Sequence, residues 1–128
     1  MKIEHIALGY NSEEEADKFF IDLFGLKKIR LKSVPEDLMK KFFCVNRESK
    51  FVVYGNEDIL FEVFITNDNT KAQDVFTHSC LLIENRDEFM SRASSMGFDL
   101  VKVPRKESNG YYLFIKDGFQ NLYEIKEK

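Results

Sequence analysis

The strongest constraint on the fold is an internal repeat. His5 and His78 lie 73 positions apart, and Ser12 and Asn85 are separated by the same interval. The two histidines each lie in an apolar segment typical of a strand, and Ser12 and Asn85 each precede a segment typical of a helix. A repeat of this length indicates two copies of one supersecondary unit, neither of which can bury its apolar face alone.

The first half has the pattern of a strand, a helix and three further strands. Residues 2–9 alternate between two faces, and the helix places apolar side chains at intervals of three and four residues. The last two strands are apolar runs separated by a polar turn, which is typical of a hairpin. The expected elements are strands at 2–9, 27–33, 51–55 and 59–66, and a helix over roughly 13–24.

The second half repeats this order. The expected elements are a strand at 77–84, a helix that runs to Met96, and strands at 98–103, 111–116 and 121–126. The residues at the helix ends also repeat. Ser12 and Asn85 each precede a Glu by three positions, which is a helix-capping pattern, and Gly25 and Gly97 are suited to the positions that end the two helices.

The first half also contains an insertion. Glu62 and Glu124 occupy matching places in the last strand of each half but lie only 62 positions apart, 11 fewer than the histidines. The segment at about 35–45 accounts for the difference. It begins with Pro35, which is well placed at the start of a helix, so a short helix is expected there.

Together these features predict an α+β fold in a single domain, residues 1–128. Two βαβββ modules are expected to form a cupped, mostly antiparallel β-sheet with helices outside. Module one spans 1–66 and includes the insertion, the polar and turn-rich stretch 67–76 is the linker, and module two spans 77–128.

Composition excludes several classes of function. Net charge is −3, the pI is about 5.5 and the basic residues are scattered, so a nucleic-acid partner is not expected. The sequence has neither a secretory signal nor a stretch long and apolar enough for a membrane helix, and a cytoplasmic protein is expected. Cys44 and Cys80 are interpreted as two buried, reduced thiols.

The residues most indicative of chemistry are the only two histidines and the two strand glutamates. His5 and His78 lie in apolar runs at the same place in each repeat. Glu62 and Glu124 interrupt apolar strands, where a carboxylate is costly to bury unless it is paired, protonated or bound to metal. Taken singly, such a His is more often a hydrogen-bonded core residue, and such a Glu is more often solvated. Their coincidence under one repeat favours a shared site.

Two imidazoles and two carboxylates form a ligand set suited to Zn, Ni, Mn, Co or Fe(II). Such a set leaves one or two positions of the metal for water or substrate. The sequence therefore predicts a divalent-metal site made by His5, Glu62, His78 and Glu124. It does not indicate which other residues contact a substrate.

The sequence resembles the vicinal oxygen chelate superfamily, which includes glyoxalase I, bleomycin resistance proteins and extradiol dioxygenases, and is closest to the glyoxalase I branch. The resembling stretches are IEHIAL, LFGLKKI, ILFEVFI, THSCLLIENRDEFMSRASSMGFDLVKVP and KDGFQNLYEIKE. The resemblance places the four metal ligands of the family at His5, Glu62, His78 and Glu124. It also implies a homodimer, since many members complete the metal-binding cup across a two-fold axis.

For function, the resemblance implies a metal-dependent lyase or isomerase of glyoxalase type. It would move a proton on a small oxygen-chelating substrate through an enediolate-like intermediate, with Glu124 as the first candidate for the base and Glu62 as the second. The turn at 116–121 lacks the family's usual Asp-Pro-Asp-Gly pattern, which argues against a glutathione hemithioacetal as the substrate. The alternatives are a metal-dependent epimerase or dioxygenase of the same superfamily, or a non-catalytic drug-binding protein.

Overall fold

The structure is a computed structural model that describes residues 2–128. The chain forms two compact units, Met1–Thr70 and Lys71–Lys128, and each is described by itself. The boundary between them falls inside the stretch 67–76 that the sequence indicates as a linker. None of the helices in the described part of the chain has the length and apolar character that crossing a membrane requires.

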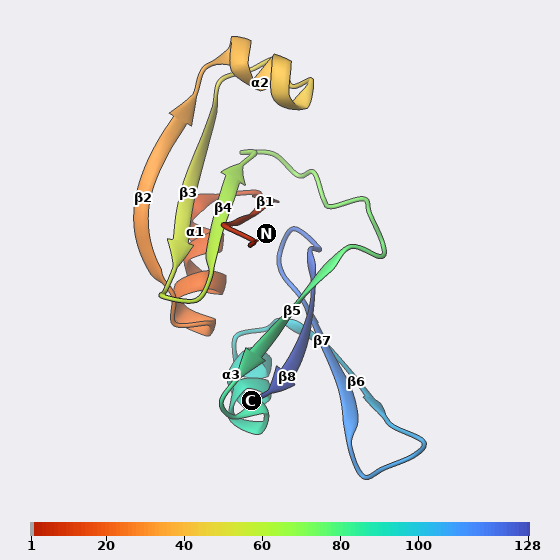
Figure 1. Ribbon diagram of the computed structural model, residues 1–128. Helices are drawn as coiled ribbons and strands as arrows, with labels where there is room; N and C mark the ends of the chain where they lie inside the picture. The colour runs from red at the N-terminus through yellow and green to blue at the C-terminus, as the bar shows by residue number, and fades with distance from the viewer. Residues whose placement is uncertain (1) are drawn as a thin grey trace. The chain divides into compact units, whose positions relative to one another are not determined.

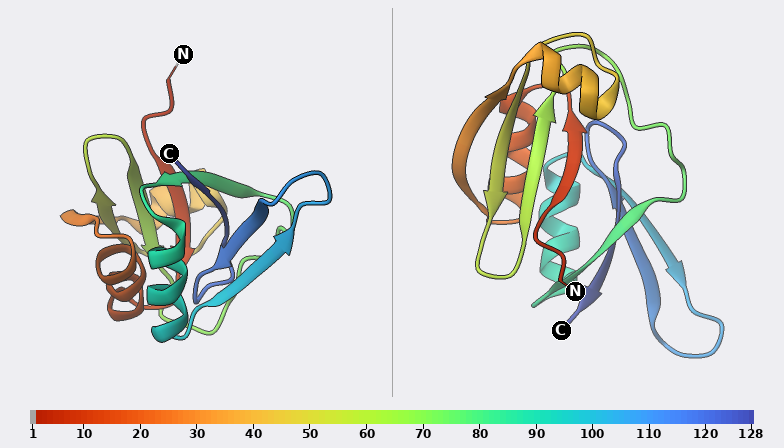
Figure 2. Two further views of the ribbon diagram at one scale, coloured as in Figure 1. Left: turned by 90° about the horizontal axis from the view of Figure 1, so that it is seen from below. Right: turned by 45° about the horizontal axis from the view of Figure 1, so that its top comes forward.

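The first unit is a four-stranded mixed sheet with a helix on one face (Figures 1 and 2). The sheet order is β1-β4-β3-β2, with β1 parallel to β4 and the other neighbours antiparallel. The elements are β1 (Ile6–Tyr10), α1 (Glu13–Asp17), η1 (Lys18–Leu23), β2 (Lys27–Val34), α2 (Glu36–Phe43), β3 (Ser49–Gly55) and β4 (Leu60–Ile65).

The second unit repeats this topology without a counterpart of α2. Its sheet order is β5-β8-β7-β6, again with one parallel pair, β5 and β8, at the edge. The elements are β5 (His78–Ile83), α3 (Arg86–Ser95), β6 (Asp99–Pro104), β7 (Tyr111–Lys116) and β8 (Leu122–Glu127). The predicted α+β class with two βαβββ modules is therefore confirmed, and the extra helix lies where the insertion was predicted.

The core of the first unit lies between its sheet and the α1–η1 helix. Phe20 is fully buried, and its ring stacks on Tyr54 at 5.0 Å and contacts Phe61 at 5.3 Å between ring centroids. Because side chains alternate along a strand, this packing directs the next residue, Glu62, to the opposite face. In the second unit, the buried Phe89 and Ala93 lie on α3, and Leu113, Ile115, Tyr123 and Ile125 are the buried strand residues.

The predicted helix boundaries hold at the residue level. The side chain of Ser12 accepts a hydrogen bond from the Glu15 backbone at 3.2 Å, and that of Asn85 accepts one from Glu88 at 3.0 Å. Gly25 adopts φ of +72° after the first helix, a left-handed conformation that favours glycine. The helix at 13–24 is not uniformly α-helical, however, because it changes to a π-helix over η1.

The expectation of buried thiols is wrong. Cys44 and Cys80 are both free, as expected, but both are exposed. Cys44 adopts φ of +58° and ends α2, so it lies at a helix terminus and not in a strand core. Cys80 alternates with the half-buried Ser79 and Leu81 along β5 and shares a face with His78. Apolar neighbours in sequence therefore did not mean a buried side chain.

Candidate metal centre

The first unit brings His5 and Glu62 together. His5 directly precedes β1, and two residues later Ala7 is the register partner of Glu62 in the parallel β1–β4 pair. Alternation then places His5 and Glu62 on the same face of the sheet. We call this face, and the face of the second unit's sheet that carries His78 and Glu124, the ligand face of each unit. The His5 Nε2 atom lies 3.4 Å from Glu62 Oε1, and the Glu62 side chain is only 21% exposed.

The second unit brings His78 and Glu124 together at the equivalent place. Cys80, two residues after His78, is the register partner of Glu124 in the parallel β5–β8 pair. The His78 Nε2 atom lies 3.7 Å from Glu124 Oε2, and the Glu124 side chain is 18% exposed. The two His–Glu pairs are thus built by the same register in two copies of one topology.

The tautomer of His78 suits a metal ligand. Its Nδ1 atom lies 2.9 Å from the backbone oxygen of Phe76, so an Nδ1–H donates there, and a neutral ring then has its lone pair on Nε2. An imidazole held by a carbonyl in this way is the usual arrangement around metal-ligating histidines. The Phe114 ring, edge-on at 5.5 Å, further limits the orientation of His78.

The surroundings of the two glutamates differ. Lys126 lies two residues beyond Glu124 on β8, and its Nζ atom is 3.8 Å from Glu124 Oε1. Cys80 lies opposite Glu124 on β5, where partial desolvation, followed by the nearby carboxylate, raises the pKa of the thiol and keeps it protonated. Glu62 instead has Phe64 at the position of Lys126 and Ala7 at that of Cys80.

The donor set fits a divalent cation in chemistry, but each unit supplies only half of it. Within residues 2–128, no group of three or more His, Cys, Asp and Glu side chains gathers as a metal-holding cluster. Each unit contributes one imidazole and one carboxylate, which is too few donors for a tetrahedral or octahedral centre. A centre with four protein ligands would therefore need both pairs.

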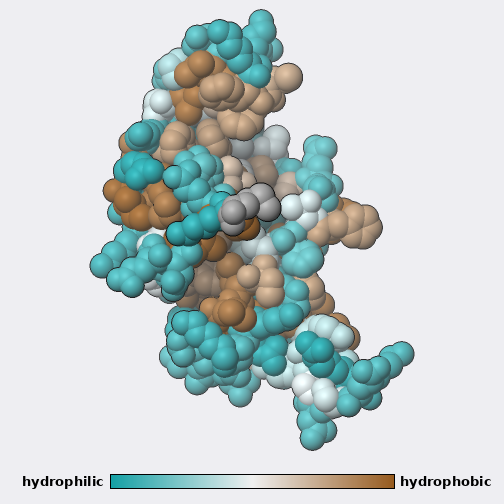
Figure 3. Space-filling model, viewed as in Figure 1, coloured by the Kyte–Doolittle hydropathy of each residue, from teal (hydrophilic) through white to brown (hydrophobic). Residues whose placement is uncertain are grey.

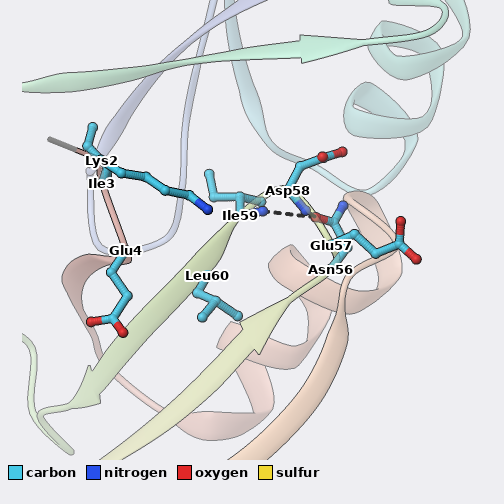
Figure 4. A pocket seen from close by; sticks show the side chains of 8 residues that line it. All are labelled: Lys2, Ile3, Glu4, Asn56, Glu57, Asp58, Ile59 and Leu60. Carbon is cyan, nitrogen blue, oxygen red and sulfur yellow. Dashed lines mark hydrogen bonds between the residues drawn. The ribbon is translucent and has the colours of Figure 1, made fainter.

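A hollow of about 450 Å³ lies beside His5 in the first unit. It is formed by the segment Lys2–Glu4 and the β3–β4 turn at 56–60, and most of its lining residues are polar (Figure 4). The turn is held by the Asn56 side chain, whose oxygen accepts the Ile59 backbone N–H at 3.0 Å. Glu4 in turn approaches His5 Nδ1 to 3.7 Å.

Comparison with solved structures identifies the fold. No family model and no curated protein sequence matches the chain. A glyoxalase family protein from Enterococcus faecalis superimposes with a TM-score of 0.73 at 14% identity, over 97% of this chain and 95% of that one. A glyoxalase family protein from Bacillus cereus gives 0.73 at 18% identity, over 99% and 93%.

A third structure is a variant of FosX, a fosfomycin resistance protein from Listeria monocytogenes, in complex with Mn(II) and 1S,2S-dihydroxypropylphosphonic acid. It superimposes with a TM-score of 0.68 at 16% identity, over 97% of this chain and 89% of that one. The chain has the vicinal oxygen chelate fold. The predicted resemblance is thereby confirmed at the level of structure.

Within this vicinal oxygen chelate fold, the sequence indicated the His–Glu pairs but not their neighbours. Lys126 could have been found, because alternation along a strand places it on the face of Glu124. Cys80 and Phe64 also belong to the surroundings of the ligand face. Phe64 could have been found in the same way, because it lies two residues after Glu62 on β4. That Cys80 lies opposite Glu124 depends on strand register, which the sequence pattern does not give.

Proposed function

We propose that His5, Glu62, His78 and Glu124 bind one divalent metal ion, and that the chain acts as a metal-dependent lyase or isomerase of glyoxalase type, as a homodimer. The observation that carries this proposal is the equivalence of the two His–Glu pairs, which occupy the same register positions in two copies of one module. Metals of the Zn, Ni, Mn, Co and Fe(II) group suit nitrogen and oxygen donors of this kind.

The proposed substrate is a small molecule that presents two adjacent oxygen atoms. A bound divalent cation would supply Lewis acidity, which stabilises negative charge developing on those oxygens and makes a neighbouring C–H bond more acidic. The protein would then remove a proton from one carbon and return it to the next. This requires a carboxylate on the ligand face that can hold a proton between the two transfers.

Glu124 is the first candidate for this base, and Glu62 is the second. Glu124 has a cation, Lys126, at 3.8 Å and the thiol of Cys80 opposite, so its carboxylate has polar partners besides a metal. Those partners would stabilise it when it moves away from the metal toward the substrate. Glu62 has apolar residues at the two corresponding positions and is better suited to remain a ligand.

A second candidate function is binding or modification of a small drug. It is favoured by the similarity to FosX, whose structure contains a diol of propylphosphonic acid with Mn(II), a small molecule with vicinal oxygens. It differs from the first candidate in reaction and not in site, because both use the ligand face. An epimerase or dioxygenase of the same superfamily would also use this face.

Metal content tests the site directly. The protein is purified without a His tag, loaded with each candidate metal and assayed by mass spectrometry, together with His5→Ala and His78→Ala. We expect about one metal per His–Glu–His–Glu set in the native protein and loss in both variants. Glu57→Gln, in the exposed β3–β4 turn, is the control and should keep its metal. Unchanged metal content in both histidine variants would rule out the site.

Activity is then tested on a panel of substrates. Methylglyoxal with glutathione and with other thiols tests the lyase, an acyl thioester with an epimerisable carbon tests the epimerase, and fosfomycin tests drug modification. Glu124→Gln should retain the fold and lose turnover. If it keeps native kcat while Glu62→Gln loses it, the roles of the two glutamates are reversed. If the metal-loaded protein turns over no member of the panel, the lyase proposal fails.

A further inference from the structure

A small apolar cavity adjoins the proposed metal site in the first unit. Its volume is about 280 Å³, and it lies between the inserted helix α2 and the ligand face of the sheet. In the space-filling view, apolar side chains lie beside hydrophilic ones at the end of the molecule that carries α2 (Figure 3). The residues that matter to its chemistry are Ala7, Gly9 and Phe64 from the sheet and Met39, Phe43 and Val45 from the insertion.

The cavity lies next to the His5–Glu62 pair on the same sheet. Ala7 is both a lining residue and the register partner of Glu62, and Gly9 is that of Phe64. Residues two apart on a strand lie on one face, about 7 Å from each other. A molecule held at Glu62 would therefore reach the cavity with any substituent longer than a few bonds.

The walls of the cavity are aromatic and aliphatic. The Phe64 ring lies 5.4 Å from that of Phe43 in an edge-to-face arrangement, so the insertion is packed against the sheet at this point. Arg47 is the only charged residue that lines the cavity among those described. It is matched by Asp68, whose Oδ2 lies 3.5 Å from Arg47 Nη1, so the cavity is nearly neutral and suits an uncharged group.

The second module lacks such a cavity wall. Residues 105–110 join β6 to β7 directly, so nothing corresponds to α2. The positions equivalent to Ala7 and Phe64 are held by Cys80 and Lys126, which are polar. The two modules therefore differ in polarity at equivalent positions of their sheets.

We propose that the α2 cavity binds an uncharged apolar substituent of the substrate, such as a phenyl or branched alkyl group, and so determines substrate specificity. This inference rests on the proposed function for the location of the reacting end. Whole drug-sized ligands fill cavities of roughly 300–1,000 Å³, so a volume near 280 Å³ suits one substituent and not a complete ligand. The polar, reacting end would then lie at the proposed metal site.

Binding of benzyl alcohol to the full chain tests the cavity without any assumption about catalysis. A titration followed by amide NMR should shift the signals of Ala7, Gly9 and Val45 and leave those of the second unit unchanged. Ala7→Leu adds a side chain at the cavity wall and should weaken binding by about tenfold. Phe43→Ala removes one wall and should weaken binding by about threefold to tenfold.

Phe42→Ala is the matched control, because Phe42 precedes Phe43 on the same helix, is 64% exposed and does not line the cavity. Its affinity should stay within about twofold of the native value. The proposal is overturned if benzyl alcohol shifts no cavity signal, or if Phe43→Ala and Phe42→Ala bind it equally well. If Ala7→Leu does not fold, the comparison of Phe43→Ala with Phe42→Ala tests the proposal instead. Both phenylalanines are exposed on α2, so neither substitution should prevent folding.

The catalytic arm separates this inference from the proposed function. With metal-loaded protein, kcat/KM is compared for thiol adducts of methylglyoxal and of phenylglyoxal. Phe43→Ala should lower the value for the phenyl substrate more than for the methyl one, by about threefold or more. Equal losses overturn the specificity role. If the protein binds benzyl alcohol in the cavity but holds no metal, the inference about the cavity is kept and only the metal-dependent function is excluded.

Discussion

The buried carboxylate of Asp117 should be one of the most sensitive positions of the second unit. Asp117 is 2% exposed in the β7–β8 turn. Its Oδ1 accepts the backbone N–H groups of Phe119 and Asn121 at 2.8 and 3.0 Å, and its Oδ2 accepts the Asn121 amide at 2.9 Å and the Tyr123 hydroxyl at 2.8 Å. These hydrogen bonds connect the turn to Tyr123 on β8, and Tyr123 directly precedes Glu124.

Asp117→Asn should destabilise the protein by about 2–3 kcal/mol. The new amide keeps an oxygen for the two backbone donors but places an NH₂ group against the Asn121 amide, so one buried donor loses its partner at about 1–3 kcal/mol. The bonds that remain also weaken, because they are no longer charge-assisted. Burial raises the pKa of Asp117 despite the bonds from Asn121 and Tyr123, so a neutral residue recovers part of this loss by avoiding desolvation.

Urea unfolding followed by circular dichroism measures the change, with the slope of the transition checked for constancy. Asp99→Asn, on the exposed start of β6, is the control and should stay within about 0.5 kcal/mol of the native protein. An Asp117→Asn protein as stable as the native one, or more stable, would show that desolvation outweighs the four hydrogen bonds. The reasoning about the turn would then be refuted.

Three further predictions concern the first unit. Tyr54→Phe removes the hydroxyl that donates to Asp17 at 2.6 Å and should cost about 1 kcal/mol near neutral pH, measured by urea unfolding. Because burial raises the pKa of Tyr54 in the folded state, native stability is lost as pH rises above the ordinary value near 10, and the difference from Tyr54→Phe should shrink there; a difference that grows contradicts the assignment. Asp68 should titrate at about 2, since the Thr70 hydroxyl and backbone lower the pKa of its carboxyl; the stability it contributes is present above its unfolded value and is lost as pH falls through about 2. Carboxyl NMR titration checks this, and Thr70→Ala should bring the pKa back toward 3.8, with an unchanged pKa excluding the cause. Gly25→Ala should cost about 1 kcal/mol in thermal unfolding, because φ is +72° there although an added Cβ would meet no atom within 4 Å; a neutral result would mean that the backbone relaxes.

The topology was predictable because its signals are local and occur twice. Ser12 and Asn85 each cap a helix through their side chains, and the strand patterns follow the alternation that the structure displays. Alternation alone places Glu62 and Glu124 each on the face of its own sheet that points away from the core, since the residues on either side of each are buried. These inferences need only periodicity and a repeat.

The rest depends on tertiary packing, which periodicity does not contain. The change from α-helix to π-helix at η1 accompanies the complete burial of Phe19, Phe20 and Leu23, a packing outcome that an i, i+3, i+4 pattern does not distinguish from a regular helix. Cys80 looked buried because its neighbours are apolar, yet it lies on the ligand face. Predicting the α2 cavity would require the knowledge that the insertion packs on Phe64, which the sequence pattern does not contain.

Because the two modules share one architecture, the direction in which a substrate binds would depend on the residues that differ between them. If the two modules were chemically identical, the two His–Glu pairs of the proposed centre would have the same surroundings, and a substrate would have no preferred direction. Phe64 and the insertion make the surroundings of Glu62 apolar in the first unit, whereas Lys126 lies 3.8 Å from Glu124 in the second unit. Proton transfer between two neighbouring carbons requires such a direction, because the base must meet the same carbon in every turnover. Exchanging the two polarities, with Phe64→Lys and Lys126→Phe in one chain, should therefore transfer the role of base from Glu124 toward Glu62, and single Glu→Gln variants in that background would reveal it.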